Sequence, residues 1–113
     1  MVSRPGYRAV SGPRTLITGS SGYFGSLLAQ KLHERGDACR LFDLVKPDEP
    51  PSGSEFVRGD VRDSESIGAA CSGIEVLYHC VAQVPLARDR ELFESVNVQG
   101  AKNTLEAAHD AGV

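Results

Sequence analysis

Three evenly spaced glycines form the part of this chain with the clearest chemical meaning. Gly19, Gly22 and Gly25 follow a short apolar run at residues 15–18 and lead into a helical pattern. Backbone amides at the start of a helix are fixed donors for pyrophosphate oxygens, and the positive end of the helix dipole strengthens that attraction. Gly19 would make the sharp turn, Gly22 would admit a phosphate, and Gly25 would let the helix pack closely. The spacing predicts a phosphate-binding junction.

An acidic residue ends the next apolar run. Asp43 follows Leu41 and Phe42, where its carboxylate would accept hydrogen bonds from the hydroxyls of an adenosine ribose. The same charge would repel a 2′-phosphate, so Asp43 favours NAD over NADP, although Lys46 nearby would favour the phosphate. An ordinary glycine-rich turn and a solvated acid at a strand end are the alternatives. A P-loop is excluded because no Lys-Ser or Lys-Thr follows the glycines.

These residues need a sheet to bring them together, and the pattern of the chain predicts one. Strand-like and helix-like segments alternate, which is typical of an α/β fold with an open parallel sheet and its first four strands in the order 3-2-1-4. Residues 45–54 are rich in proline and predict an exposed connection. The expected strands are residues 14–18, 38–43, 55–58 and 76–81, and the expected helices are residues 22–35, 63–72 and 90–111.

The two long helices each carry an apolar stripe at three- and four-residue spacing. Such a stripe predicts that this side of the helix packs on the sheet. Gly36 and Gly112 are expected to end these helices. The stripe consists of Phe24, Leu27, Leu28 and Leu32 in the first helix, and of Phe93, Ala101, Leu105 and Ala108 in the last.

Length, charge and cysteine spacing limit the classes of protein to which this chain could belong. The 113 residues suffice for one domain at 14–113, preceded by a flexible arm at 1–13. Lys and Arg are scattered and the net charge is −3, so no nucleic-acid partner is expected. No apolar run approaches the roughly 20 residues of a membrane span, and cytoplasmic localisation follows by default. Cys39, Cys71 and Cys80 lack zinc or redox spacing, which predicts buried reduced thiols and no metal site.

Three further segments carry a family resemblance. They read RGDVRD at 58–63, LYHCVA at 77–82 and NVQGAKN at 97–103. With the glycine turn they resemble the extended short-chain dehydrogenases, in particular the NAD-dependent epimerase/dehydratase group and its 3β-hydroxysteroid dehydrogenase branch, over residues 15–113. The resemblance implies a Rossmann-type sheet with helices on both faces, a homodimer, and an NAD-dependent oxidoreductase. Its small-molecule substrate would be a nucleotide sugar, a sterol or a similar hydroxyl compound that exchanges hydride with nicotinamide.

The resemblance also implies residue roles. Asp60 would accept a hydrogen bond from the adenine amino group, and Val61 would pack beside the base. The end of the fourth strand would lie under the ribose and nicotinamide half, although Val81 stands where the family usually has alanine. Asn97 would help to hold the cofactor, with a plain polar helix residue as the alternative. The cofactor-binding residues expected in all are Gly19, Gly22, Tyr23, Phe24, Gly25, Asp43, Asp60, Val61, Cys80, Val81, Ala82 and Asn97.

No catalytic residue is assigned within these 113 residues. The family's base is a tyrosine with a lysine four residues later, and Tyr7, Tyr23 and Tyr78 all lack that lysine. His79 occupies a family position that is usually structural, and His33 and His109 are expected at the surface.

The pattern stops at Val113, where a fifth strand would begin, so the fold is expected to be incomplete relative to the family. The chain is then interpreted as an N-terminal cofactor-binding portion without the substrate domain, and marginally stable or self-associating alone because a strand edge is exposed. A non-catalytic NAD(P)-sensing module is the alternative function, and a dimerising module is a third.

Overall fold

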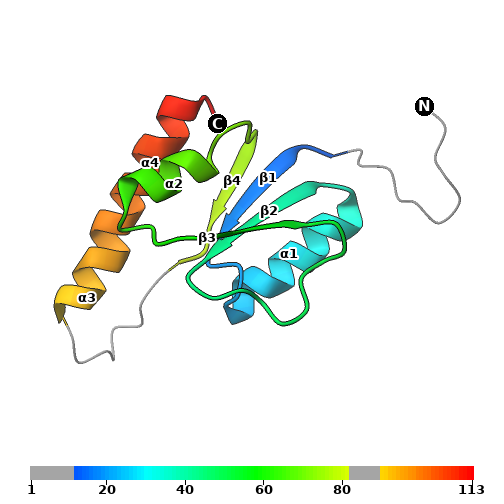
Figure 1. Cartoon of the computed structure of the whole chain (residues 1–113), viewed down its shortest axis with the longest axis horizontal. Helices are drawn as coiled ribbons and strands as arrows, with labels where there is room; N and C mark the ends of the chain where they lie inside the picture. The colour runs from blue at the N-terminus through cyan, green and yellow to red at the C-terminus, as the bar shows by residue number, and fades with distance from the viewer. Residues whose placement is uncertain (1–11, 82–89) are drawn as a thin grey trace, which may run out of the picture.

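The computed structural model describes residues 12–81 and 90–113 (Figure 1). Its strands and helices alternate in the first part of the chain and end in one long helical segment. In chain order the elements are β1 (Arg14–Thr18), α1 (Tyr23–Arg35), β2 (Ala38–Asp43), β3 (Glu55–Arg58), α2 (Ser64–Ala70), β4 (Val76–His79), α3 (Arg90–Glu94), the π-helical turn η1 (Ser95–Gln99) and α4 (Gly100–Ala111).

The four strands form one parallel sheet in the order β3-β2-β1-β4, which confirms the predicted order. Ile17 of β1 is paired with Leu41 of β2 on one side and with Tyr78 of β4 on the other. Because all four strands run in the same direction, their carboxyl ends share one edge of the sheet. The glycine turn, Asp43 and the segment after Arg58 therefore meet at that edge.

Helices cover both faces of the sheet, α1 on one side and α2 with α4 on the other (Figure 1). Alternate residues of each strand point to opposite faces, so Ile17 and Leu16 enter different cores. The core under α1 contains Ile17, Ala29, Leu32, Cys39 and Leu41, and the core under α2 contains Leu16, Phe42, Val61, Ile67, Ala70, Cys71 and Ile74.

Only half of the apolar stripe predicted for α1 is buried. Leu32 is buried and Leu28 packs against the same core, whereas Phe24 and Leu27 are 66% and 52% exposed. The helix instead presents small residues to the sheet, because Gly25 lies directly against the backbone of the preceding turn and fixes the rotation of the helix. The expectation that Phe24 and Leu27 face the core was wrong.

The final helix is also rotated from its predicted position. Leu105, expected to pack on the sheet, is 72% exposed. The π-helical turn η1 inserts a wider turn between α3 and α4, which shifts the residues that face the sheet by a fraction of a turn. Phe93, Ala101 and Ala108 are only half-buried. The buried positions are Val96, Gly100, Asn103 and Thr104.

The fourth strand is two residues shorter than predicted and ends at His79. The hydroxyl of Thr18 lies 2.7 Å from His79 Nδ1, and the Cys80 amide donates to Thr18 Oγ1 at 3.1 Å. Partial desolvation of the imidazole lowers the pKa of His79. Thr18 thus ties the end of β1 to the chain that leaves β4, and fixes where Cys80 and Val81 begin.

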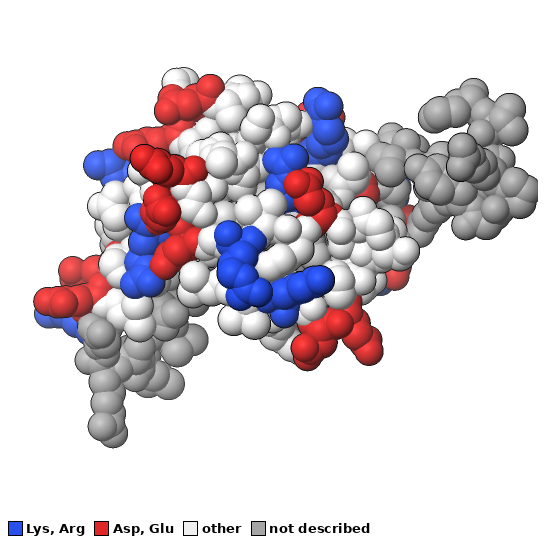
Figure 2. Space-filling view, in the orientation of Figure 1, with Lys and Arg blue, Asp and Glu red and all other residues white. Residues whose placement is uncertain are grey.

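Charged side chains of both signs cover the surface of the molecule. Figure 2 shows both signs of charge interspersed on the visible face, with acidic side chains gathered over α2 and α4.

The three cysteines are free thiols, with Cys39 and Cys71 buried and Cys80 only half-buried. Burial raises the pKa of Cys39 to about 11. None of the helices in the described ranges has the length and apolar character needed to cross a membrane.

Candidate cofactor site at the carboxyl edge of the sheet

A pocket of about 250 Å³ opens at the carboxyl edge of the sheet. This is the place where ligands bind in open α/β sheets, because the loops after the strands leave a crevice there. Five segments contribute its walls. They are the turn with Gly19 and Gly22, residues 42–44 at the end of β2, residues 59–62 after β3, Cys80 and Val81 after β4, and Leu92 of α3 with Val96 of η1.

The glycine turn has the geometry that its spacing suggests. Gly19 adopts a φ of +69°, in the region that favours glycine, and a Cβ there would lie 2.8 Å from the carbonyl carbon and oxygen of Cys80. A Cβ on Gly25 would collide with the carbonyl oxygen of Gly19, so the helix packs on the turn itself. A Cβ on Gly22 would meet only that same oxygen, at 3.3 Å. Gly22 therefore borders open space beside the pocket.

The start of α1 fits an anionic group. Gly22 is its N-cap, no side chain caps the helix, and the first turn carries no acidic residue. The first amides of a helix lack intrahelical acceptors and sit at the positive end of its dipole. A pyrophosphate placed against Gly22 would supply the missing acceptors, and the open Cβ direction leaves room for it.

Asp43 is joined to the turn by hydrogen bonds. Its Oδ2 accepts from the Ser21 amide at 3.0 Å and its Oδ1 from the Val45 amide at 3.2 Å, while the Ser21 hydroxyl donates to the Val45 carbonyl. The amide of Gly59 donates to the Asp43 carbonyl at 3.0 Å. Each carboxylate oxygen has two lone pairs, so both oxygens keep one for the hydroxyls of a ribose. The carboxylate lines the pocket in a fixed orientation.

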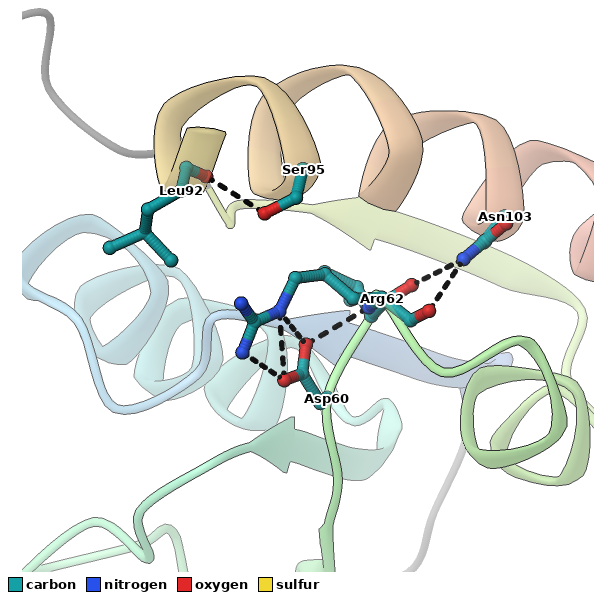
Figure 3. A network of polar contacts seen from close by, with 6 residues as sticks. Asp60, Arg62, Leu92, Ser95 and Asn103 are labelled. Carbon is teal, nitrogen blue, oxygen red and sulfur yellow. Dashed lines mark hydrogen bonds and ion pairs between the residues drawn. The ribbon is translucent and has the colours of Figure 1, made fainter. Parts of the chain in front are cut away.

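Asp60 also lines the pocket, and Arg62 holds it (Figure 3). Arg62 Nη2 lies 2.6 Å from Asp60 Oδ2, Arg62 Nε lies 3.0 Å from each oxygen, and the Arg62 amide donates to Oδ1 at 2.9 Å. These hydrogen bonds lower the pKa of Asp60 below its usual range. The family resemblance implies a place for Asp60 at the cofactor, and Asp60 lines the pocket, but its pairing with Arg62 was not predicted.

A buried amide supports this turn from behind. Asn103 of α4 donates from Nδ2 to the carbonyls of Val61 and Arg62, both at 3.1 Å (Figure 3). Its Oδ1 accepts from Gln99 at 2.9 Å. A Cβ on Gly100 would lie 2.7 Å from Val61, so this glycine lets α4 approach the turn. The last helix and the turn after β3 are thus one packed unit.

Four residues expected at the cofactor are not among the described residues that line the pocket. Tyr23 and Phe24 are 86% and 66% exposed, and neither lines the pocket. Asn97 lies within η1, one residue past Val96, and is not among the lining residues either. Ala82 falls outside the described residues. The cofactor roles of these four residues stay predictions.

Other lining residues were not expected from the sequence. Leu92 and Val96 are four residues apart in the helical segment, and both line the pocket. This spacing predicts that the two side chains share one face of a helix, but it does not predict what that face contacts. Leu44 lines the pocket beside Asp43, and Arg62 belongs to the segment that carries the family resemblance. No group of three metal-ligating side chains occurs in the part of the chain that the structure describes.

Comparison with known proteins places this geometry in a family context. Residues 16–113 match the model of the 3-beta hydroxysteroid dehydrogenase/isomerase family. The 3-beta-hydroxysteroid dehydrogenase of Mycolicibacterium neoaurum is 37% identical over 109 residues, covering 88% of this chain and 30% of that protein. The human sterol-4-alpha-carboxylate 3-dehydrogenase (decarboxylating) is 32% identical over 100 residues, covering 88% of this chain and 26% of that protein.

A solved structure agrees with the fold. The UDP-glucose 4-epimerase of Thermus thermophilus, in complex with NAD, superposes with a TM-score of 0.81 at 32% identity, over 88% of this chain and 35% of that one. The present chain spans between a quarter and a third of the length of the curated relatives named above.

Proposed function

Because this chain belongs to the 3-beta hydroxysteroid dehydrogenase/isomerase family, we propose that it binds NAD in the pocket at the carboxyl edge of its sheet. The bound dinucleotide would accept hydride from a carbon that bears a hydroxyl group. The residues of this chain hold and orient the cofactor for that transfer. The protein is then an NAD-dependent oxidoreductase, and this chain is its cofactor-binding part.

The observation that carries the proposal is the connection between the glycine turn and Asp43. The Ser21 amide fixes the carboxylate in the same pocket that Gly22 lines, and this supports adjacent positions for a phosphate at the turn and a ribose at Asp43. An adenosine diphosphate group presents these two features in the same order. The negative charge of Asp43 favours a free 2′-hydroxyl, and therefore NAD over NADP.

The remaining walls divide between the two ends of the cofactor. Asp60 and Val61 follow β3 and would meet the adenine, with Val61 supplying an apolar surface and Asp60 an acceptor. Cys80 and Val81 follow β4, beside the turn at Gly19, and would pass under the ribose and nicotinamide half. The apolar side chains of Leu92 in α3 and Val96 in η1 line the opposite wall of the pocket and would exclude water from it.

The relatives favour a substrate class. The two curated relatives described above are named as dehydrogenases of a steroid and of a sterol carboxylate. A secondary ring alcohol of sterol type is therefore the substrate that we propose. A nucleotide sugar is the second choice, because the structurally similar epimerase is named for UDP-glucose.

A homodimer is part of the same proposal. Analytical ultracentrifugation of the complete protein, which measures its mass in solution, tests the dimer.

Turnover of NAD tests the enzymatic part. The complete protein is incubated with NAD and a 3β-hydroxysterol, or with NAD and UDP-glucose, while NADH absorbance and product composition are followed. Oxidation of the sterol with formation of NADH supports the proposal, and Asp43→Ala should slow it while Asp48→Ala, in the exposed loop, should not. Tight NAD binding with no conversion of either compound would favour the NAD-sensing module instead.

A further inference from the structure

Asp60 and Arg62 form an ion pair on the wall of the pocket, with Val61 between them in the chain. Both side chains are partly accessible, at 27% for Asp60 and 39% for Arg62. Pairs this exposed add little to stability, because solvent screens them and ordering long side chains costs entropy. A purely stabilising role therefore explains little about this pair.

The hydrogen bonds of the pair define the orientation of the Asp60 carboxylate, although they contribute little to stability. Arg62 approaches with Nε at 3.0 Å from both carboxylate oxygens and with Nη2 at 2.6 Å from Oδ2, while its own amide donates to Oδ1 at 2.9 Å. An arginine fork of this kind fixes the plane of a carboxylate, which a single point charge does not. Asp60 is consequently held in one rotamer.

The backbone that carries the pair is fixed as well. Asn103, which is 7% exposed, donates to the carbonyls on both sides of the Val61–Arg62 peptide, and Gln99 in turn orients Asn103. Figure 3 shows the Arg62 side chain reaching from this anchored backbone toward the Asp60 carboxylate. The backbone of Arg62 is therefore held by Asn103, and its guanidinium group is bound to the Asp60 carboxylate.

We propose that Arg62 is a positioning residue for the adenine end of the cofactor, and that it acts by holding the Asp60 carboxylate in the orientation that accepts from the adenine amino group. This inference rests on the proposed function, because it requires a dinucleotide in the pocket. Without the fork, the carboxylate would rotate toward solvent and each binding event would have to order it again. Arg62 itself need not touch the cofactor.

The test compares two dinucleotides that differ at one group. Nicotinamide hypoxanthine dinucleotide replaces the adenine amino donor by a carbonyl oxygen, which a carboxylate cannot bind. Calorimetric titration of the complete protein should show NAD bound about tenfold more tightly than this analogue, as expected for one hydrogen bond to a charged acceptor. Arg62→Met should weaken NAD binding and remove most of that preference, and Arg62→Lys should restore part of it.

Two further variants separate positioning from general damage. Arg14→Met removes the same charge at the opposite edge of the sheet and should leave the preference for NAD intact. In an Asp60→Asn background, Arg62→Met should have almost no further effect on NAD binding, because the residue that it orients is gone.

An Arg62→Met protein that keeps the wild-type preference overturns the inference alone. Equal additional losses in the two backgrounds would do the same. A wild-type protein that binds neither dinucleotide overturns the proposed function and this inference with it.

Discussion

The backbone amide of Ser21 donates to Oδ2 of Asp43 across 3.0 Å, and this hydrogen bond makes one unit of the glycine turn and the acid at the end of β2. Thr18 and Phe42, which precede the two segments, are paired in the sheet, so the contact follows from the parallel register. A substitution in either segment should consequently weaken the binding of both the phosphate and the ribose of the proposed cofactor.

The first prediction concerns two glycines in helices. Gly25→Ala should destabilise the protein by about 1–3 kcal/mol, because its Cβ would overlap the backbone of the turn, which cannot move away without shifting Gly19. Gly68→Ala in α2 is the matched control: a Cβ there meets nothing within 4 Å, and alanine should stabilise the helix by about 0.5–1 kcal/mol. Urea denaturation of both variants measures the difference, and equal stabilities would contradict the close packing at Gly25.

The second prediction concerns pH and the buried Asp37. Its carboxylate accepts from Arg35 Nε at 2.9 Å, from Arg35 Nη2 at 2.7 Å and from the Thr15 hydroxyl at 2.8 Å, and the Arg35 bonds above all lower its pKa. Because the folded pKa lies below the unfolded value of about 4, the unfolded chain takes up the proton first as the pH falls. Stability should decline from just above that value downward.

Asp37→Asn tests this assignment. The variant should lose about 2 kcal/mol at neutral pH, where the ionised carboxylate contributes fully, and should show a shallower decline below about pH 5. Asp48→Asn, in the exposed loop, serves as the control and should match the wild type at every pH. An Asp37→Asn protein with the full wild-type decline would show that another group is responsible.

The third prediction concerns the amide that joins α4 to the turn after β3. Asn103→Ala leaves the carbonyls of Val61 and Arg62 without their donor and should cost about 2 kcal/mol in the free energy of unfolding. Lys102→Ala changes the exposed neighbouring residue and should have an effect within about 0.5 kcal/mol. Thermal denaturation followed by circular dichroism compares them. If the two variants melt together, Asn103 does not hold the turn.

The sheet and the central residues of the site were predictable because they depend on local pattern and chain topology. Alternating strands and helices with right-handed crossovers leave few arrangements, so the order 3-2-1-4 follows from the element order. Parallel strands bring their carboxyl ends together, which places Asp43 beside the turn at Gly19. Asp60 follows β3 and so reaches the same edge of the sheet, but its place at the adenine was predicted from the family resemblance and not from this rule.

The remaining features depend on packing that a linear pattern does not contain. The spacing of the apolar residues in α1 predicts that Phe24 and Leu27 face the core. In the structure Gly25 packs against the turn, and the helix is rotated so that both side chains point away from the sheet. The π-helical turn before Gly100 has no sequence signal in this chain, so Leu105 was placed on the wrong side.

The walls of the pocket show the same limit. Leu92 of α3 lines the pocket, and the helical segment that carries it packs on the turn after β3 through Gly100 and Val61, which is a long-range contact. The pairing of Arg62 with Asp60 is one of several conformations open to an arginine two residues away from an acid, and the surrounding fold selects it.

The most direct test of the central claim is a calorimetric titration of the complete protein with NAD and with NADP, in the wild type and in Asp43→Ala. The wild type should bind NAD more tightly than NADP. Asp43→Ala should weaken NAD binding by about 10–100-fold, as expected for hydrogen bonds to a charged group, and should weaken NADP binding less, because it also removes the repulsion of the 2′-phosphate. Equal losses for the two cofactors, or no binding of either by the wild type, would contradict the assignment of this pocket to NAD.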